Sequence, residues 1–303
     1  MFTEPITNDE ILCVHAYYNC SSLDSVRIHD HPFKGNMMPR TAEARSLIAT
    51  ILIHFEAFEQ ATNARKRKRR LADQRLFAQQ VEAVLCEVLC RELTTPHEWL
   101  AIPFSHRFLG KKGDRYAPSI LTEKMVYVIK TLAQPELGLL DLVLGQRDFL
   151  QPSQSCLTVF KAAPQLVHEI ERLGLSLDDF VTSLDVETVV LKAPKATSSA
   201  RAVRIDYADD LVTKAYRQEM MIINTWLHQA DIRCLPSSDE AVIDVSRRTL
   251  TRTFSNGSFV QCGRLFGGFW IEMRKPQRLE RLRIDGKKIV ELDYQSMIAR
   301  LLY

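Results

Sequence analysis

The strongest local constraint in this sequence is an Asp-Gly pair near its C-terminal end. Asp285 and Gly286 lie between two segments rich in β-forming residues, within the stretch 281–292. Both residues tolerate positive backbone φ angles, so this pair predicts a two-residue turn between two antiparallel strands. The second strand is expected to cover 288–292 and to end directly before Asp293.

A carboxylate at the end of that strand has two interpretations. The apolar side chains that follow recur at helical spacing: Met297, Ile298, Leu301 and Leu302. Asp293 or Ser296 can therefore cap a helix that starts here. A carboxylate held between a strand and a helix is also well placed to bind a metal ion. The residues alone leave both roles open.

Two short motifs in this region resemble a known family. The stretch Asp293-Tyr294-Gln295-Ser296-Met297-Ile298-Ala299-Arg300 resembles the first catalytic motif of family A DNA polymerases, D-Y-S-Q-I-E-L-R. Upstream, Cys262-Gly263-Arg264-Leu265 is similar to the T-G-R-L motif of that family. A group of phage and integrated-element proteins with G-G-R-x-x-G-G-x-W and E-L-D-Y-S-x-L-H-x-R-x-L-Y is similar over the same residues.

The resemblance implies roles for four residues. Asp293 would be a ligand of two catalytic Mg²⁺ ions, which stabilise the attacking and leaving oxygens in phosphoryl transfer. Arg264 would hold a nucleic-acid phosphate, for which its planar fork is suited. Tyr294 would lie near the incoming sugar, and Arg300 would brace the site. The implied partner is DNA or RNA.

The sequence departs from this family in ways that limit the expected activity. Ile298 stands where the family has the glutamate that selects the sugar. The family's second aspartate motif and its fingers helix would follow Tyr303, where the sequence given ends. We therefore expect a fragment, one half of a split enzyme completed by a second polypeptide, or a protein that binds without catalysis.

Composition favours a globular protein with a mildly basic charge. The hydrophobic fraction is 46%, and the formal net charge is +3. Such a charge permits a nucleic-acid partner without requiring one. The seven cysteines are scattered, with no C-x-x-C pair, so a disulfide framework is not expected. The sequence has neither a signal peptide nor an apolar run of membrane-spanning length, so we expect a cytoplasmic protein with no membrane partner.

The densest charge in the sequence is a run of six cations. It consists of Arg65, Lys66, Arg67, Lys68, Arg69 and Arg70. A run of this kind can contact phosphate, because neutralised phosphates release their counterions. It can equally be a solvated junction between two helices. A helix is predicted on each side of the run, from Thr41 to about Ala64 and over about 76–89.

The middle of the chain predicts a helix, a hairpin and a second helix. The first helix follows Thr122, the strands cover 139–144 and 156–160, and the second helix starts at Pro164 and ends at Gly174. A helix beside a hairpin with a basic tip is typical of a winged-helix DNA-binding domain. Arg147, in the loop between the strands, and Lys161 are its candidate DNA contacts.

A long helix and a glycine-rich segment follow. The helix is predicted over 211–230, with Trp226 among its inward residues and Asn224 expected to face solvent or nucleic acid. The glycines of 263–270 can allow close approach of a substrate strand or serve a bend. The predicted fold class is α+β, with a helical region at 1–117, a winged-helix-like domain at 118–193 and a partial polymerase-like palm at 204–303.

Three functions are consistent with these patterns. The leading one is a replication-type nucleic-acid-binding protein of mobile-element origin, as a truncated or split template-directed DNA polymerase that uses Mg²⁺. The second is a non-catalytic DNA-binding replication initiator. The third is an interaction module whose C-terminal hairpin docks on another chain.

Overall fold

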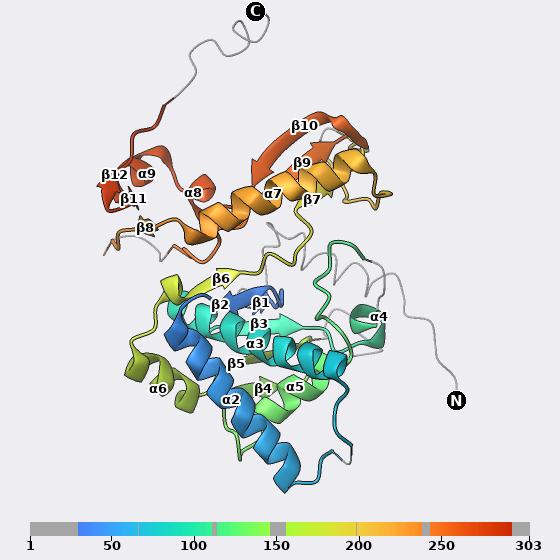
Figure 1. Ribbon diagram of the computed structural model, residues 1–303, viewed down its shortest axis with the longest axis vertical. Helices are drawn as coiled ribbons and strands as arrows, with labels where there is room; N and C mark the ends of the chain where they lie inside the picture. The colour runs from blue at the N-terminus through green and yellow to red at the C-terminus, as the bar shows by residue number, and fades with distance from the viewer. Residues whose placement is uncertain are drawn as a thin grey trace, which may run out of the picture. The chain divides into compact units, whose positions relative to one another are not determined.

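The computed structural model describes residues 30–65, 67–110, 114–145, 156–197, 199–237 and 243–292. The chain divides into two compact units, Met1–Glu187 and Thr188–Tyr303. Each unit combines helices with small sheets, so the architecture is mixed α+β (Figure 1).

The first unit contains a four-stranded sheet in the order β1-β3-β5-β4. Its strands are β1 (Asp30–Pro32), β3 (Trp99–Ile102), β5 (Thr158–Ala162) and β4 (Leu140–Val143). β1 pairs with β3 in parallel, and the other two pairings are antiparallel. The strands β2 (Met37–Pro39) and β6 (Phe180–Thr182) form a separate antiparallel pair.

Helix α3 (Leu71–Thr94) lies at the centre of the first unit and is buried over most of its circumference. It packs against α2 (Ala42–Ala61), α5 (Lys124–Leu132), β2 and β5 (Figure 1). Phe55 of α2 meets Phe77 of α3 edge to face, with 5.0 Å between ring centroids. Burying each such ring contributes about 1.5–3 kcal/mol, so this helix pair is a main source of the unit's stability.

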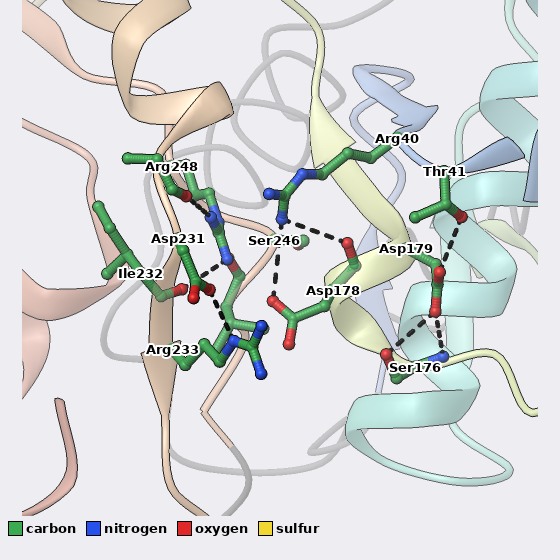
Figure 2. A network of polar contacts seen from close by, with 12 residues as sticks. Arg40, Thr41, Ser176, Asp178, Asp179, Asp231, Ile232, Arg233, Ser246 and Arg248 are labelled. Atoms are coloured by element: carbon green, nitrogen blue, oxygen red, sulfur yellow. Dashed lines mark hydrogen bonds and ion pairs between the residues drawn. The ribbon is translucent and has the colours of Figure 1, made fainter. Parts of the chain in front are cut away.

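A polar network fixes the start of α2. Thr41 caps the helix, and its hydroxyl donates to the Asp179 carboxylate over 2.7 Å. Asp179 closes the 3₁₀ turn η2 (Leu177–Asp179) by accepting from Ser176, as Figure 2 shows. α4 (His106–Leu109) and α6 (Pro164–Leu173) complete the helices described in this unit, and α6 ends at Gly174 with φ +62°.

In the second unit, α7 (Leu211–Gln229) crosses a three-stranded sheet in the order β10-β9-β7 (Figure 1). The strands are β10 (Ser258–Phe266), β9 (Thr251–Ser255) and β7 (Val189–Leu191). Asn224 of α7 is buried, and its side chain pairs with both the N–H and the carbonyl of Leu250. The expectation that Asn224 faces solvent or nucleic acid is therefore wrong.

A second sheet of this unit has the order β12-β11-β8, with β8 (Ile232–Cys234), β11 (Leu282–Ile284) and β12 (Lys287–Lys288). The short helices α8 (Phe269–Glu272) and α9 (Lys275–Arg281) precede β11. The buried guanidinium of Arg248 supports β8 by donating to the carbonyls of Ala230 and Ile232 over 3.0 and 2.7 Å (Figure 2).

The Asp-Gly turn is confirmed, but the strand after it is shorter than expected. Asp285 and Gly286 have φ of +50° and +72°, and they join β11 to β12. β12 ends at Lys288 rather than at Leu292, and 289–292 form no strand. Because α9 runs to Arg281, β11 has only three residues, so at most three residues after the turn can pair with it and a strand to Leu292 has no partner.

The glycines of 263–270 serve bends in the backbone. Cys262 and Gly263 both have positive φ, at a register shift in the pairing of β10 with β9. Gly267 has φ +117°, and a Cβ there would lie 2.5 Å from the Thr249 carbonyl oxygen. These contacts account for both glycines without a substrate strand.

Candidate nucleic-acid interface

The basic run forms the connector between α2 and α3, and Arg69 fixes it in place. The Arg69 guanidinium makes two hydrogen bonds to the Glu59 carboxylate, of 2.6 and 2.5 Å. Both side chains are almost fully buried, at 7% and 4% exposure. The same guanidinium lies 3.5 Å above the centre of the Phe77 ring. Arg69 therefore holds the end of the connector against both helices.

Tyr127 of α5 completes this anchor. Its hydroxyl donates to a Glu59 oxygen over 2.8 Å. Burial, followed by this hydrogen bond, raises the pKa of Tyr127 above its usual range. The phenol therefore stays protonated and remains a donor to Glu59 at neutral pH. Three elements, α2, α3 and α5, converge on one ion pair at the base of the connector.

The other described cations of the run point into solvent. Arg65, Arg67, Lys68 and Arg70 are all exposed. The side chains of Arg67, Lys68 and Arg70 make no hydrogen bond or ion pair with any described residue, while Arg65 donates to the Arg67 carbonyl. Lys66 lies outside the described residues. The run thus combines one buried, paired cation with neighbours that are free to meet an anion.

Lys161 and Arg264 lie on strands in different units. Lys161, on β5, is 3.8 Å from the Asp141 carboxylate and 4.9 Å from the centre of the Trp99 ring. Arg264, on β10, is opposite Thr253, is exposed, and makes no hydrogen bond or ion pair with any described residue. Lys161 is therefore already engaged within its own sheet, whereas Arg264 is available.

The remaining predicted site residues lie outside the part of the chain that the structure describes. These are Asp293, Tyr294 and Arg300 at the C-terminal end, and Arg147, which lies between β4 and β5 in the sequence. Among the described residues, no group of three or more His, Cys, Asp or Glu side chains is placed to hold a metal ion. The nearest described carboxylate to Asp293 in sequence, Glu291, pairs with Arg278 over 2.9 Å. Magnesium binding stays a prediction that rests on Asp293.

The sequence-based reasoning missed the role of Arg69. Nothing in a run of six cations marks one member as buried, because its partner Glu59 lies ten residues upstream on helix α2. It also missed the pairing of Arg283 with Lys288 across the C-terminal hairpin, although the Asp-Gly turn fixes that register.

Comparisons with known proteins do not add to this picture. No family model, curated protein or solved structure matches this chain. Within the described ranges, none of the helices is long and apolar enough to cross a membrane.

Proposed function

We propose that this protein binds the phosphate backbone of a nucleic acid through the connector between α2 and α3. The observation that carries the proposal is that exposed cations, Arg67, Lys68 and Arg70, flank a cation that is locked into a buried ion pair. Arg69 itself is left out of the contact set because its guanidinium is already bound to Glu59.

Pre-organisation distinguishes this connector from a disordered basic tail. A tail must lose conformational freedom when it binds, and that loss reduces its affinity. Here the Glu59–Arg69 pair holds one end of the connector before any ligand arrives, so less freedom is lost on binding. Each phosphate neutralised by a cation also releases condensed counterions, which favours association at low salt.

The acidic groups near the connector offset part of its charge, because the Asp73 carboxylate interacts electrostatically with Arg70 and Arg65. Asp73, in the first turn of α3, is hydrogen-bonded to Lys124, and this bond lowers the pKa of Asp73. Glu56 accepts a hydrogen bond from Gln74. The Glu59–Arg69 pair would stabilise a solvated junction as well, so binding and the solvated-junction alternative are separated by the affinity of connector variants.

The test is affinity for a labelled oligothymidylate at low salt. A triple variant, Arg67→Gln, Lys68→Gln and Arg70→Gln, is expected to bind at least about tenfold more weakly, because three phosphate contacts are lost. A control variant removes three exposed cations elsewhere in the same unit, Lys34, Lys130 and Arg172, of which Arg172 pairs with Glu169 over 2.6 Å. Equal affinity losses in the two triple variants would argue against a specific contact at the connector.

A second candidate function is template-directed nucleotidyl transfer, as the resemblance to family A DNA polymerases implies. It is supported by the Asp285-Gly286 hairpin, whose second strand ends at Lys288 before Asp293 in the sequence, and by exposed Arg264 on β10. In this reading Asp293 holds Mg²⁺, Arg264 binds a phosphate, and a second polypeptide supplies the rest of the palm. Two bound cations would stabilise the charge that develops on the transferred phosphoryl group.

This candidate requires that Asp293→Asn weakens Mg²⁺ binding, measured by calorimetry, while leaving oligothymidylate affinity unchanged. Primer extension should appear when the chain is combined with the protein that completes the palm. If Asp293→Asn binds Mg²⁺ as tightly as the native protein, the proposed nucleotidyl transfer is contradicted, while the proposed nucleic-acid binding is unaffected.

The finer parts of the predicted architecture belong to the same proposal. α5, the β4–β5 hairpin and α6 follow one another in the order of a winged helix. β5 also pairs with β3, so the hairpin is part of a larger sheet. We propose that Arg147, between β4 and β5 in the sequence, contacts DNA, and that the segment 204–303 is the opening of a palm-like domain.

A further inference from the structure

Three cations form a row across the small sheet of the second unit. In the register of this sheet, Arg283 of β11 lies directly opposite Lys288 of β12 on one side and Arg233 of β8 on the other. Directly opposed residues share a face of the sheet. The three side chains therefore project from the same face, on strands about 4.8 Å apart.

Such a row is unfavourable in the protein alone. Like charges directly opposite each other destabilise a strand pair, and this row contains two such pairs. One acidic group offsets part of the charge, because Asp231 accepts a hydrogen bond from Arg233 over 2.6 Å (Figure 2). Among the described residues, no carboxylate pairs with Arg283 or Lys288, and these two cations remain directly opposed.

The contacts of Arg283 and Lys288 leave both charges available. Arg283 donates to two backbone carbonyls, those of Glu280 and Leu282, over 2.7 and 2.8 Å. Lys288 is exposed and makes no hydrogen bond or ion pair with any described residue. Carbonyl partners orient the Arg283 guanidinium without neutralising it. An external anion would therefore be stabilised by the whole row.

The net charge of the second unit also favours an anionic ligand. Residues 188–303 contain 19 Lys and Arg against 13 Asp and Glu, whereas residues 1–187 contain 21 against 24. The basic excess of the protein therefore lies in the unit that contains the row. A surface of this sign attracts polyanions over a distance of several ångströms and raises their rate of association.

We propose that Arg233, Arg283 and Lys288 form a second phosphate-binding site, which contacts consecutive phosphates of a nucleic-acid strand. The class of ligand rests on the proposed function, but the site lies in the other unit and does not depend on the connector. A regular line of cations suits a regular line of phosphates. An acidic peptide in extended form, with same-face carboxylates about 7 Å apart, is the alternative ligand, and a comparison of polyglutamate with oligothymidylate separates the two.

Guanidinium groups strengthen this assignment. Their planar forks match the geometry of phosphate oxygens, and two of the three members of the row are arginines. Arg233 contacts Asp231 through Nε, and Asp231 would compete with phosphate for this one member of the row. Lys288, on the outer strand, is exposed and makes no hydrogen bond or ion pair with any described residue, so it is the best position for a test.

The experiment compares two adjacent charge reversals, Lys288→Glu and Lys287→Glu. Lys287 is exposed but lies opposite Ile284 on the other face, so it changes the net charge equally without entering the row. In ligand-free protein, Lys288→Glu is expected to raise the unfolding midpoint by about 1–4 °C, because a carboxylate then faces Arg283. Lys287→Glu should leave the midpoint nearly unchanged.

The affinity for a nucleic acid should fall in the variant whose unfolding midpoint rises. Lys288→Glu is expected to weaken oligothymidylate binding more than Lys287→Glu and to reduce the salt dependence by about 0.7 of a logarithmic slope unit. A substitution that raises stability and lowers affinity indicates that the residue serves binding. Replacing a residue with a purely structural role would lower both the stability and the affinity of the protein. Lys288→Gln, which removes the charge without adding one, should give a smaller change of the same sign.

The outcomes separate this inference from the proposed function. Equal losses of affinity for Lys288→Glu and Lys287→Glu would overturn the row, even if the connector triple variant still binds weakly. A loss confined to Lys288→Glu, with the connector variant unaffected, would support the row and contradict the connector. Tighter binding to polyglutamate than to oligothymidylate, with the same dependence on Lys288, would assign the row to an acidic polypeptide and overturn the nucleic-acid assignment.

Discussion

The buried side chain of Glu87 fixes the position of a neighbouring loop. This carboxylate on α3 is buried, and it accepts hydrogen bonds of 2.6 Å from the backbone N–H groups of Lys34 and Gly35. It thereby ties the loop between β1 and β2 to the central helix. Burial raises its pKa to about 7, against the opposing effect of the two hydrogen bonds and of nearby cations.

The raised pKa predicts a pH dependence of stability. Because the folded-state pKa lies above the unfolded value of about 4.5, folding favours the protonated form, and this contribution is lost as pH rises from about 4.5 through 7. It amounts to about 3 kcal/mol at most. The unfolding free energy of Glu87→Gln minus that of the native protein should therefore be more positive at pH 8 than at pH 5.

The measurement is urea unfolding of both proteins at pH 5 and pH 8. The difference between native protein and variant removes the contributions of other titrating groups. A difference in unfolding free energy that stays the same at the two pH values would show that Glu87 titrates in its ordinary range.

At the scale of elements, several predictions from the sequence are confirmed because their signals are local. Thr41 caps α2, Pro164 starts α6, and Gly174 ends α6, each through contacts within a few residues. The Asp-Gly turn likewise fixes the register of its own hairpin. Arg233, the third member of the cation row, could not be placed this way, because β8 precedes β11 by about fifty residues.

In helix α7, the spacing of apolar residues predicts the buried face incorrectly. Trp226 was expected to face inward but is 63% exposed, while Thr213 and Asn224 are buried. Thr213 belongs to the capping box with Asp210, and Asn224 satisfies the backbone of Leu250. Apolar periodicity cannot detect a polar side chain that is buried because distant backbone groups need a partner.

The connector gives a prediction at the same scale. Arg69→Met removes the partner of buried Glu59 and should destabilise the protein by about 3–5 kcal/mol in urea unfolding. The double variant Arg69→Met, Glu59→Met should recover much of this loss, because no unpaired charge remains buried. If the single variant loses less than about 1 kcal/mol, the ion pair does not anchor the connector.

At the scale of the whole molecule, charge is distributed unevenly between two units. The first unit is slightly acidic overall but concentrates cations in one fixed connector, while the second is basic and presents a row of cations on a sheet. Each unit thus offers one phosphate-binding surface. Binding through both would make the affinity for a strand long enough to reach them exceed that of either surface alone.

The salt dependence of binding tests the central claim most directly. We expect the logarithm of the association constant for oligothymidylate to fall linearly with the logarithm of salt concentration. The connector variant Arg67→Gln, Lys68→Gln, Arg70→Gln should show a slope reduced by about 2, at about 0.7 for each lost contact with a single strand. The control variant lacking the charges of Lys34, Lys130 and Arg172 should keep the native slope. A connector variant with the native slope would contradict the account.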